Sequence, residues 1–310
     1  MARFIFTLPF LFLLTTCATI SSSVQGPFKL SDPLARLDSA DEFAPLEYGA
    51  DAYIFIDAPN ARPILDLFTI GNMTHEQFGQ IAEQTSAIRV ALYKKTADGQ
   101  KNNFMAAARG HYPNVLSAMA LTASPDWQKV RAWNGAPYWY SEAAGVSLAM
   151  NTNWALFSSN EPFAREPAPL PPAGFDVFRQ GAVVSGWLID DSTLNKMFEV
   201  MEIPIKIDAK TMFFRVDGLQ SPADSNGETY KIILQFDLSA PEQSGGLLTL
   251  FELAGLFIAE NSASDAPLSL AAKSLLTNSV QAEEGVLTLT TAGLSAERLG
   301  LIFSVFSACL

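Results

Sequence analysis

Few residues in this chain of 310 have side chains that could carry out chemistry. There are two histidines, His75 and His111, and two cysteines, Cys17 and Cys309. A structural zinc site needs about four nitrogen or sulfur ligands close together in space, and two histidines are too few for a histidine-rich site. We therefore predict that the protein has no metal site and needs no cofactor.

Acid–base and nucleophilic catalysis also lack a recognisable set of residues. The paired carboxylates Asp190 and Asp191 stand directly before a segment with helical periodicity, so we expect them to cap that helix. The sequence contains no G-x-S-x-G motif, and no glycine-rich phosphate loop precedes a helix. We predict that the protein is not an enzyme.

Aromatic side chains form the cluster that most favours binding. Five of them are candidates for a surface that contacts a ligand or a partner: Trp133, Tyr138, Trp139, Tyr140 and Trp154. Because alternate residues of a strand face opposite sides, Trp139 would point away from its two tyrosine neighbours. Core packing is the alternative for the same residues. The functional interpretation is a platform for an apolar ligand, a glycan or a partner.

The start of the chain predicts export. Arg3 is followed by an apolar run from Phe4 to Leu14, and Cys17 comes shortly after that run. The run is shorter than the roughly 20 residues of a membrane-spanning helix. It has instead the length of the apolar part of a secretory signal, about 7–15 residues. Residues 1–16 are therefore predicted to be a signal peptide.

The tetrapeptide Leu14-Thr15-Thr16-Cys17 resembles the processing motif of bacterial lipoprotein precursors, in the relaxed form found in spirochaetes. The resemblance implies that Cys17 becomes the mature N-terminus and carries two or three acyl chains, which suffice for stable anchoring where one is marginal. It also implies a lipid-anchored protein of the bacterial cell envelope, in the inner or the outer membrane. A secreted or soluble periplasmic protein, cleaved at an ordinary signal site, is the alternative.

The net charge of the chain limits the classes of partner that it is expected to bind. Twenty basic residues against 32 acidic ones give a formal net charge of −12. A chain of this charge repels phosphate backbones and anionic lipid headgroups, so nucleic acid is not an expected partner. We expect the membrane to be reached through the lipid on Cys17, and an apolar ligand or another envelope protein to be the further partner.

The body of the chain is predicted to be α+β, with pseudo-duplicated antiparallel sheets and helices packed on one face. Residues 17–45 are expected to form a flexible lipid-anchored tether. A first half covers 46–160, a proline-rich linker covers 161–174, and a second half covers 175–310. The expected strands of the first half are Ala52–Asp57, Ile88–Lys94, Phe104–His111, Tyr138–Met150 and Trp154–Ser158.

Two apolar segments in the second half have special interest. Leu247–Ala259 and the tail Leu299–Leu310 are each too short to span a bilayer. Each is predicted to be a helix of the core or an amphipathic helix that meets lipid.

Together these features predict an exported, lipid-anchored envelope protein that acts by binding or structural contact. One alternative is a carrier of lipid or another apolar ligand, with a cavity between the sheet and its apolar helices. The other is an exported hydrolase with a site assembled from scattered residues, for which substitution of Asp190 or His111 would be the test.

Overall fold

The computed structural model describes residues 34, 37, 43–65, 83–93, 103–189, 191–218, 230–261, 267–276, 278–283 and 285–309. The signal peptide, the lipidation site Cys17, His75 and Asp190 lie outside these residues. The predictions made for them therefore stay predictions.

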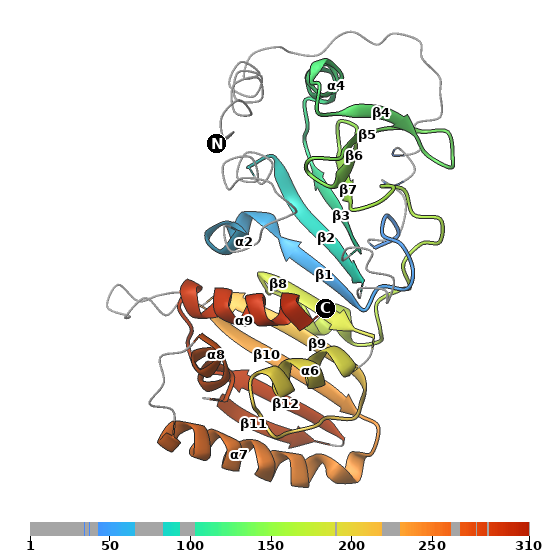
Figure 1. Ribbon diagram of the computed structural model, residues 1–310. Helices are drawn as coiled ribbons and strands as arrows, with labels where there is room; N and C mark the ends of the chain where they lie inside the picture. Colours follow the sequence, from blue (N-terminus) through green and yellow to red (C-terminus); the bar gives the residue numbers. More distant parts are fainter. Residues whose placement is uncertain are drawn as a thin grey trace.

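All of the described strands belong to one antiparallel sheet (Figure 1). They are β1 (Ala52–Asp57), β2 (Thr85–Tyr93), β3 (Asn103–Gly110), β4 (Gln128–Arg131), β5 (Pro137–Ser141), β6 (Val146–Met150), β7 (Trp154–Ser158), β8 (Val184–Leu188), β9 (Ala209–Gly218), β10 (Tyr230–Leu238), β11 (Asn278–Glu283) and β12 (Val286–Thr291). Their order across the sheet is β11-β12-β10-β9-β8-β1-β2-β3-β7-β6-β5-β4.

The two halves of the chain meet at the centre of this sheet. β1 pairs with β2 on one side and with β8 on the other, so that Ile54 stands between Val90 and Gly186. Each half begins in the same way, with a strand, a helix and a long hairpin: β1 leads through α2 (Ala58–Leu65) to β2 and β3, and β8 leads through α6 (Ser192–Val200) to β9 and β10. The halves thus contribute to a single continuous sheet.

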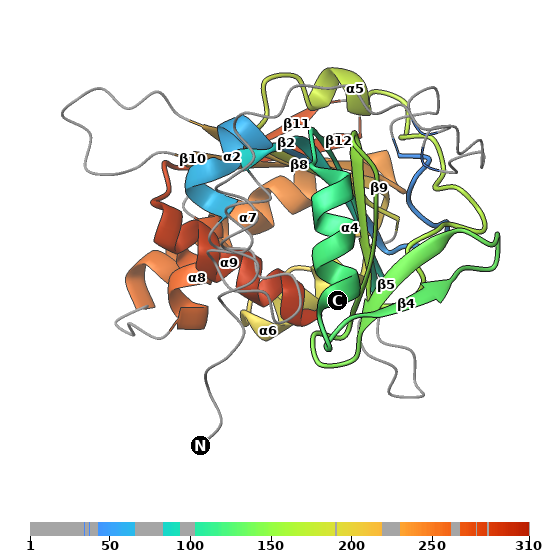
Figure 2. The ribbon, with the colours of Figure 1, turned by 90° about the horizontal axis from the view of Figure 1, so that it is seen from above.

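Most of the helices cover one face of the sheet, whereas α5 lies on the other side (Figure 2). Besides α2 and α6 they are α4 (Asn114–Ala123), α5 (Phe175–Phe178), α7 (Ser244–Asn261), α8 (Pro267–Leu276) and α9 (Ala296–Cys309), with a short 3₁₀ turn at Pro241–Gln243. This arrangement confirms the predicted α+β class with helices packed on one face of an antiparallel sheet.

The helix-covered face holds the larger hydrophobic core. β9 shows how the sequence builds it, because Met212, Phe214 and Val216 alternate with Phe213 and Arg215 and point toward the helices. On the helix side, apolar residues of α6 recur at spacings of three and four residues and meet those strand residues.

The opposite face is covered by two pieces of mostly irregular chain, residues 43–50 and 161–178, which we call the strap; the second piece ends with α5. The two pieces pair with each other, since the N–H of Tyr48 donates to the carbonyl of Glu166 and the N–H of Ala168 to that of Leu46. Phe43 and Phe175 of the strap are buried against the sheet, where the centre of each ring lies 4.8 Å from that of Trp187 of β8. Phe43 of the predicted tether and Phe163 of the predicted linker are buried in this core, while the domain boundaries placed there stay predictions.

Two local predictions are wrong. Tyr138–Met150 is a hairpin of β5 and β6 rather than one strand, because the chain turns at Gly145, whose φ of 64° an L side chain rarely adopts. Asp191 precedes α6 but makes no capping hydrogen bond through its side chain. Its backbone is helical (φ −82°, ψ −6°), whereas a capping residue is extended and so aims its side chain at the free N–H groups.

Candidate functional site

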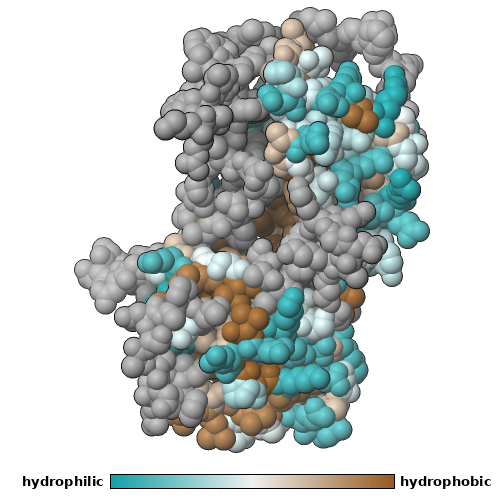
Figure 3. Space-filling view, viewed as in Figure 1, coloured by the Kyte–Doolittle hydropathy of each residue, from teal (hydrophilic) through white to brown (hydrophobic). Residues whose placement is uncertain are grey.

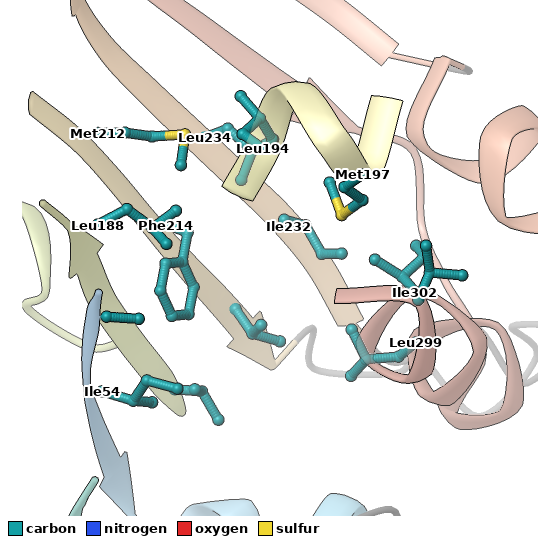
Figure 4. Packing of buried hydrophobic residues seen from close by; sticks show 14 of the residues in the cluster. Ile54, Leu188, Leu194, Met197, Met212, Phe214, Ile232, Leu234, Leu299 and Ile302 are labelled. Atoms are coloured by element: carbon teal, nitrogen blue, oxygen red, sulfur yellow. The ribbon is translucent and has the colours of Figure 1, made fainter. Parts of the chain in front are cut away.

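The most distinctive site on the described residues is an apolar cavity of about 50 Å³ between the sheet and three helices. Strands β8, β9 and β10 form its floor, and α6, α8 and α9 form its walls. Its lining is Leu188, Leu194, Met197, Met212, Phe214, Val216, Ile232, Leu234, Leu275, Ile302, Phe303 and Phe306. Figure 4 shows several of these side chains pointing into the space between sheet and helices.

The residue spacing of the strands and helices directs these side chains into the same cavity. Alternate positions of β9 and β10 reach it from below, as a strand requires. Leu194 and Met197 stand one helical turn apart on α6, and both are almost completely buried. Ile302 and Phe306 are likewise one turn apart on α9. Six separate elements therefore contribute to the site.

Gly186 keeps the floor of the cavity open. A Cβ at this position would lie 2.6 Å from the ring of Phe214 and 2.4 Å from the carbonyl oxygen of Tyr53. Because β8 has no side chain there, the Phe214 ring can approach the strand closely. Any larger residue would drive that ring toward the cavity.

The chemistry of the lining is that of hydrocarbon. All twelve lining side chains are apolar, so the cavity offers a ligand no hydrogen bond and no charge. A volume of 10–15 Å³ would admit one water molecule, but an apolar cavity without polar partners stays dry. The arrangement can hold aliphatic or aromatic groups, and it provides nothing for acid–base or nucleophilic chemistry.

A second apolar feature lies on the outside of α7. Leu250, Leu253 and Leu256 recur every three residues and are 48%, 56% and 64% exposed. The other side of the same helix is buried through Leu247 and Phe251. Figure 3 shows hydrophobic residues reaching the surface beside α9 and along α7. We call the three exposed leucines the α7 stripe.

The five predicted aromatic residues are not one surface. Trp139 is buried on the helix side, where its Nε1–H donates to Thr122 Oγ1 at 3.2 Å. Trp154 is buried on the strap side. Tyr138 and Tyr140 are half-buried on that same side, and Trp133 is 54% exposed at the turn between β4 and β5. Their role in binding stays a prediction, for which Trp133, Tyr138 and Tyr140 are the accessible members.

Guanidinium groups stacked on aromatic rings are a feature that sequence reasoning missed. Arg89 is only 5% exposed, and its guanidinium carbon lies 5.7 Å from the centre of the Phe55 ring and 5.5 Å from that of Trp154. Arg179 lies 4.9 Å from the same Phe55 ring. The pairing of Phe55 with Arg89 across β1 and β2 depends on strand register, which the sequence does not reveal.

Tyrosine hydroxyls attach the strap to the sheet. Tyr53 and Tyr93 both donate to the carbonyl oxygen of Glu47, at 3.0 and 2.8 Å. Burial raises the pKa of both phenols. At the far end of β2, burial raises the pKa of Tyr112 to about 12, although a hydrogen bond with Thr85 at 2.8 Å opposes this shift.

The remaining candidates for chemistry are isolated where they are described. His111 is exposed beyond the end of β3. Within the described ranges, no three His, Cys, Asp or Glu residues are grouped so that they could hold a metal ion. Among the helices in the same part of the chain, none is long and apolar enough to cross a membrane.

Comparisons with known proteins agree on one relative. Residues 38–165 match the family model described as "Outer membrane-associated lipoprotein TP0453". Solved structures titled as crystal forms III, I and IV of TP0453 have TM-scores of 0.55, 0.57 and 0.53 with this chain, at sequence identities of 16%, 15% and 14%. They cover 86–87% of this chain and 98–99% of theirs. No protein in the set of curated proteins matches.

These matches bear on the prediction drawn from the first seventeen residues. The family match supports an exported lipoprotein of the cell envelope, and the structural matches show the shared fold. The chain is similar to the outer membrane-associated lipoprotein TP0453 in sequence over residues 38–165 and in fold over most of its length, which confirms its resemblance to bacterial lipoproteins.

Proposed function

We propose that this protein is a lipid-anchored envelope protein that binds the hydrocarbon part of an apolar ligand, without catalysis. The observation that carries the proposal is the cavity between the sheet and helices α6, α8 and α9, whose entire lining is apolar. Its ligand would be recognised by fit and by exclusion of water, since the lining provides no polar contact.

The size of the cavity limits how much of a ligand enters. About 50 Å³ accommodates the end of an acyl chain, while a complete chain requires α9 to move away from the sheet. Each methylene buried there contributes about 0.8 kcal/mol. A polar headgroup would stay outside, beside the partly exposed Phe303 and Phe306 of α9.

A fluorescent fatty acid tests the proposal. The full chain would carry Cys17→Ser, so that no lipid of its own competes, and would be refolded without detergent. We expect saturable binding that Met197→Phe weakens about tenfold, because the larger ring displaces roughly two methylenes of the ligand. Met197 is 3% exposed and lines the cavity.

Met201→Phe is the matched control. It makes the same change one turn further along, at a buried methionine that does not line the cavity. Equal affinity of the two variants would show that the probe binds elsewhere, and absence of saturable binding would contradict the proposal.

The α7 stripe favours a second candidate function, contact with a lipid surface. Three exposed leucines on one helix suit insertion into the interface of a bilayer. The Cys17→Ser chain should float with neutral phosphatidylcholine vesicles, and Leu253→Glu should abolish this. Gln180→Glu adds a negative charge at an exposed position after α5, away from α7, and should retain flotation. Flotation lost equally in both variants would reject the stripe as the contact.

We also propose the outer membrane as the location, because the matching family is described by that membrane. Anchoring would depend on acyl chains at Cys17. Fractionation of wild-type and Cys17→Ser cells would test this, with wild-type protein expected in the outer-membrane fraction and the variant expected in the soluble fraction. Wild-type protein in the inner-membrane fraction would contradict it.

A further inference from the structure

β4 forms one edge of the sheet, at the opposite end from β11. We propose that β4 is a docking strand for an extended segment of a partner protein in which acidic and apolar residues alternate. In the part of the chain that the structure describes, β4 pairs with β5 alone. The other edge differs, because α7 packs against β11.

The backbone of β4 points the required groups outward. The N–H of Ala132 donates to the carbonyl of Ala136 at 2.9 Å, which makes these two residues a hydrogen-bonded pair. In an antiparallel ladder such pairs recur at every second residue. Val130 therefore directs its N–H and carbonyl to Tyr138 of β5, whereas Lys129 and Arg131 direct theirs away from the sheet.

The side chains of β4 determine which residue types a partner strand should carry at alternate positions. Lys129 and Arg131 are exposed and share one face of the strand, where the Lys129 ammonium lies 5.6 Å from the centre of the Trp139 ring. Val130 shares the other face with Tyr138, its partner across the β4–β5 pair. Directly opposed residues of an antiparallel pair have side chains on the same face. An added strand would thus meet two cations on one face, and on the other Val130 and the Tyr138 ring next to the exposed Gln128, so it should alternate acidic and apolar residues.

Charge also excludes the simplest alternative occupant. Two copies of the chain that paired through β4 would bring Lys129 and Arg131 of each strand together, and like charges in opposed positions are destabilising. Cationic edge residues of this kind protect a sheet against self-association. The same two cations attract an acidic strand. Lys129 and Arg131 would therefore both hinder self-association through β4 and favour an acidic partner.

A peptide probe tests the proposal on the full chain carrying Cys17→Ser. The probe is a fluorescent twelve-residue peptide that alternates Glu and Val, and binding is followed by anisotropy. One reference peptide has the same composition arranged as Glu-Glu-Val-Val repeats, and another alternates Lys and Val. We expect the alternating acidic peptide to bind about tenfold more tightly than either reference.

Substitutions at residue 129 separate strand addition from simple charge attraction. Lys129→Pro removes the outward N–H without touching a bond to β5, and Lys129→Gln removes the same charge but keeps the N–H. Lys129→Pro should lose at least about tenfold in affinity, and Lys129→Gln only about two- to fivefold. Arg131→Pro, at the next outward N–H, repeats the test if Lys129→Pro lowers the melting temperature.

Three results would overturn the proposal. They are equal binding of the alternating acidic peptide and the Glu-Glu-Val-Val peptide, equal losses in the proline and glutamine variants, and no saturable binding of the alternating peptide. Because none of these measurements involves the apolar cavity, they fail or succeed independently of fatty-acid binding.

Discussion

The two faces of the sheet are filled in different ways. On the strap face, the ring of Trp187 lies 5.0 Å from that of Tyr53 and 4.8 Å from each of Phe43 and Phe175. On the helix face, Met197 and Phe214 border a cavity of about 50 Å³. The first face is filled by interlocking rings, whereas the second retains apolar space.

We infer from this difference that the strap face contributes stability and the helix face binds a ligand. Interiors normally pack as densely as organic crystals, so a persistent apolar void costs stability. The strap face can compensate for that cost through close aromatic packing and through the two tyrosine hydrogen bonds to Glu47. The helix face is then free to exchange its void for a ligand.

Trp187→Ala should have the largest effect on stability. The side chain is 1% exposed at the centre of the strap face, and replacing such a residue by alanine costs about 3–5 kcal/mol. Urea unfolding followed by far-UV circular dichroism would measure the loss. A loss below about 0.5 kcal/mol, within the range of ordinary surface substitutions, would mean that the aromatic cluster does not stabilise the strap face.

Gly186→Ala should cost about 1–3 kcal/mol, because the added Cβ overlaps both the Phe214 ring and the carbonyl of Tyr53. It should also weaken fatty-acid binding by pushing that ring into the cavity. The same unfolding assay, together with the fluorescent fatty acid, would measure both effects. Gly218→Ala is the control, since a Cβ there meets only Val183 at an ordinary 3.4 Å; equal losses in both variants would contradict the account.

The free energy of unfolding should fall at alkaline pH, where the buried phenol of Tyr112 ionises more readily in the unfolded chain than in the folded protein. The folded-state pKa of Tyr112 is raised to about 12, so its contribution to stability is complete below the unfolded pKa of about 10 and is lost as the pH rises toward 12. Between these limits Tyr112 lowers the free energy of unfolding by at most about 1.4 kcal/mol per pH unit.

Tyr112→Phe tests this dependence. The variant loses the hydrogen bond with Thr85 at every pH, but its stability should fall less steeply than that of the wild type between pH 10 and 12. Urea titrations at intervals across this range would give both slopes. Identical slopes would show that Tyr112 does not titrate with a raised pKa in the folded protein.

Met197→Phe should change stability least, by less than about 1 kcal/mol, because the added volume enters existing space. The same assay applied to Ala107→Leu, at a fully buried position of the strap-side core, should show a larger loss. Similar losses at the two positions would remove the contrast in packing density.

Prediction from sequence succeeded where a signal is local. The run Ala52–Asp57 predicted β1, and the apolar run Leu247–Ala259 predicted the helix α7. The α+β class followed from the order of such elements. A cavity between sheet and helices was foreseen as an alternative, but its lining comes from six elements and could not be assigned from spacing.

Prediction failed where tertiary contacts decide. The four residues of β4 have no clear apolar alternation, and their strand state depends on pairing with β5. The proline-rich segment 161–174 has no helix or strand period, so its burial of Phe163 could not be inferred. The stacking of Arg89 on Phe55 and Trp154 likewise requires knowledge of strand register.

Native mass spectrometry with palmitic acid would show whether the cavity between the sheet and helices α6, α8 and α9 takes up a fatty acid. The Cys17→Ser chain, refolded without detergent, would be compared with its Met197→Phe and Met201→Phe variants. We predict one bound fatty acid in the parent chain and in Met201→Phe, and strongly reduced occupancy in Met197→Phe. No adduct in the parent chain, or equal occupancy in all three proteins, would contradict the account.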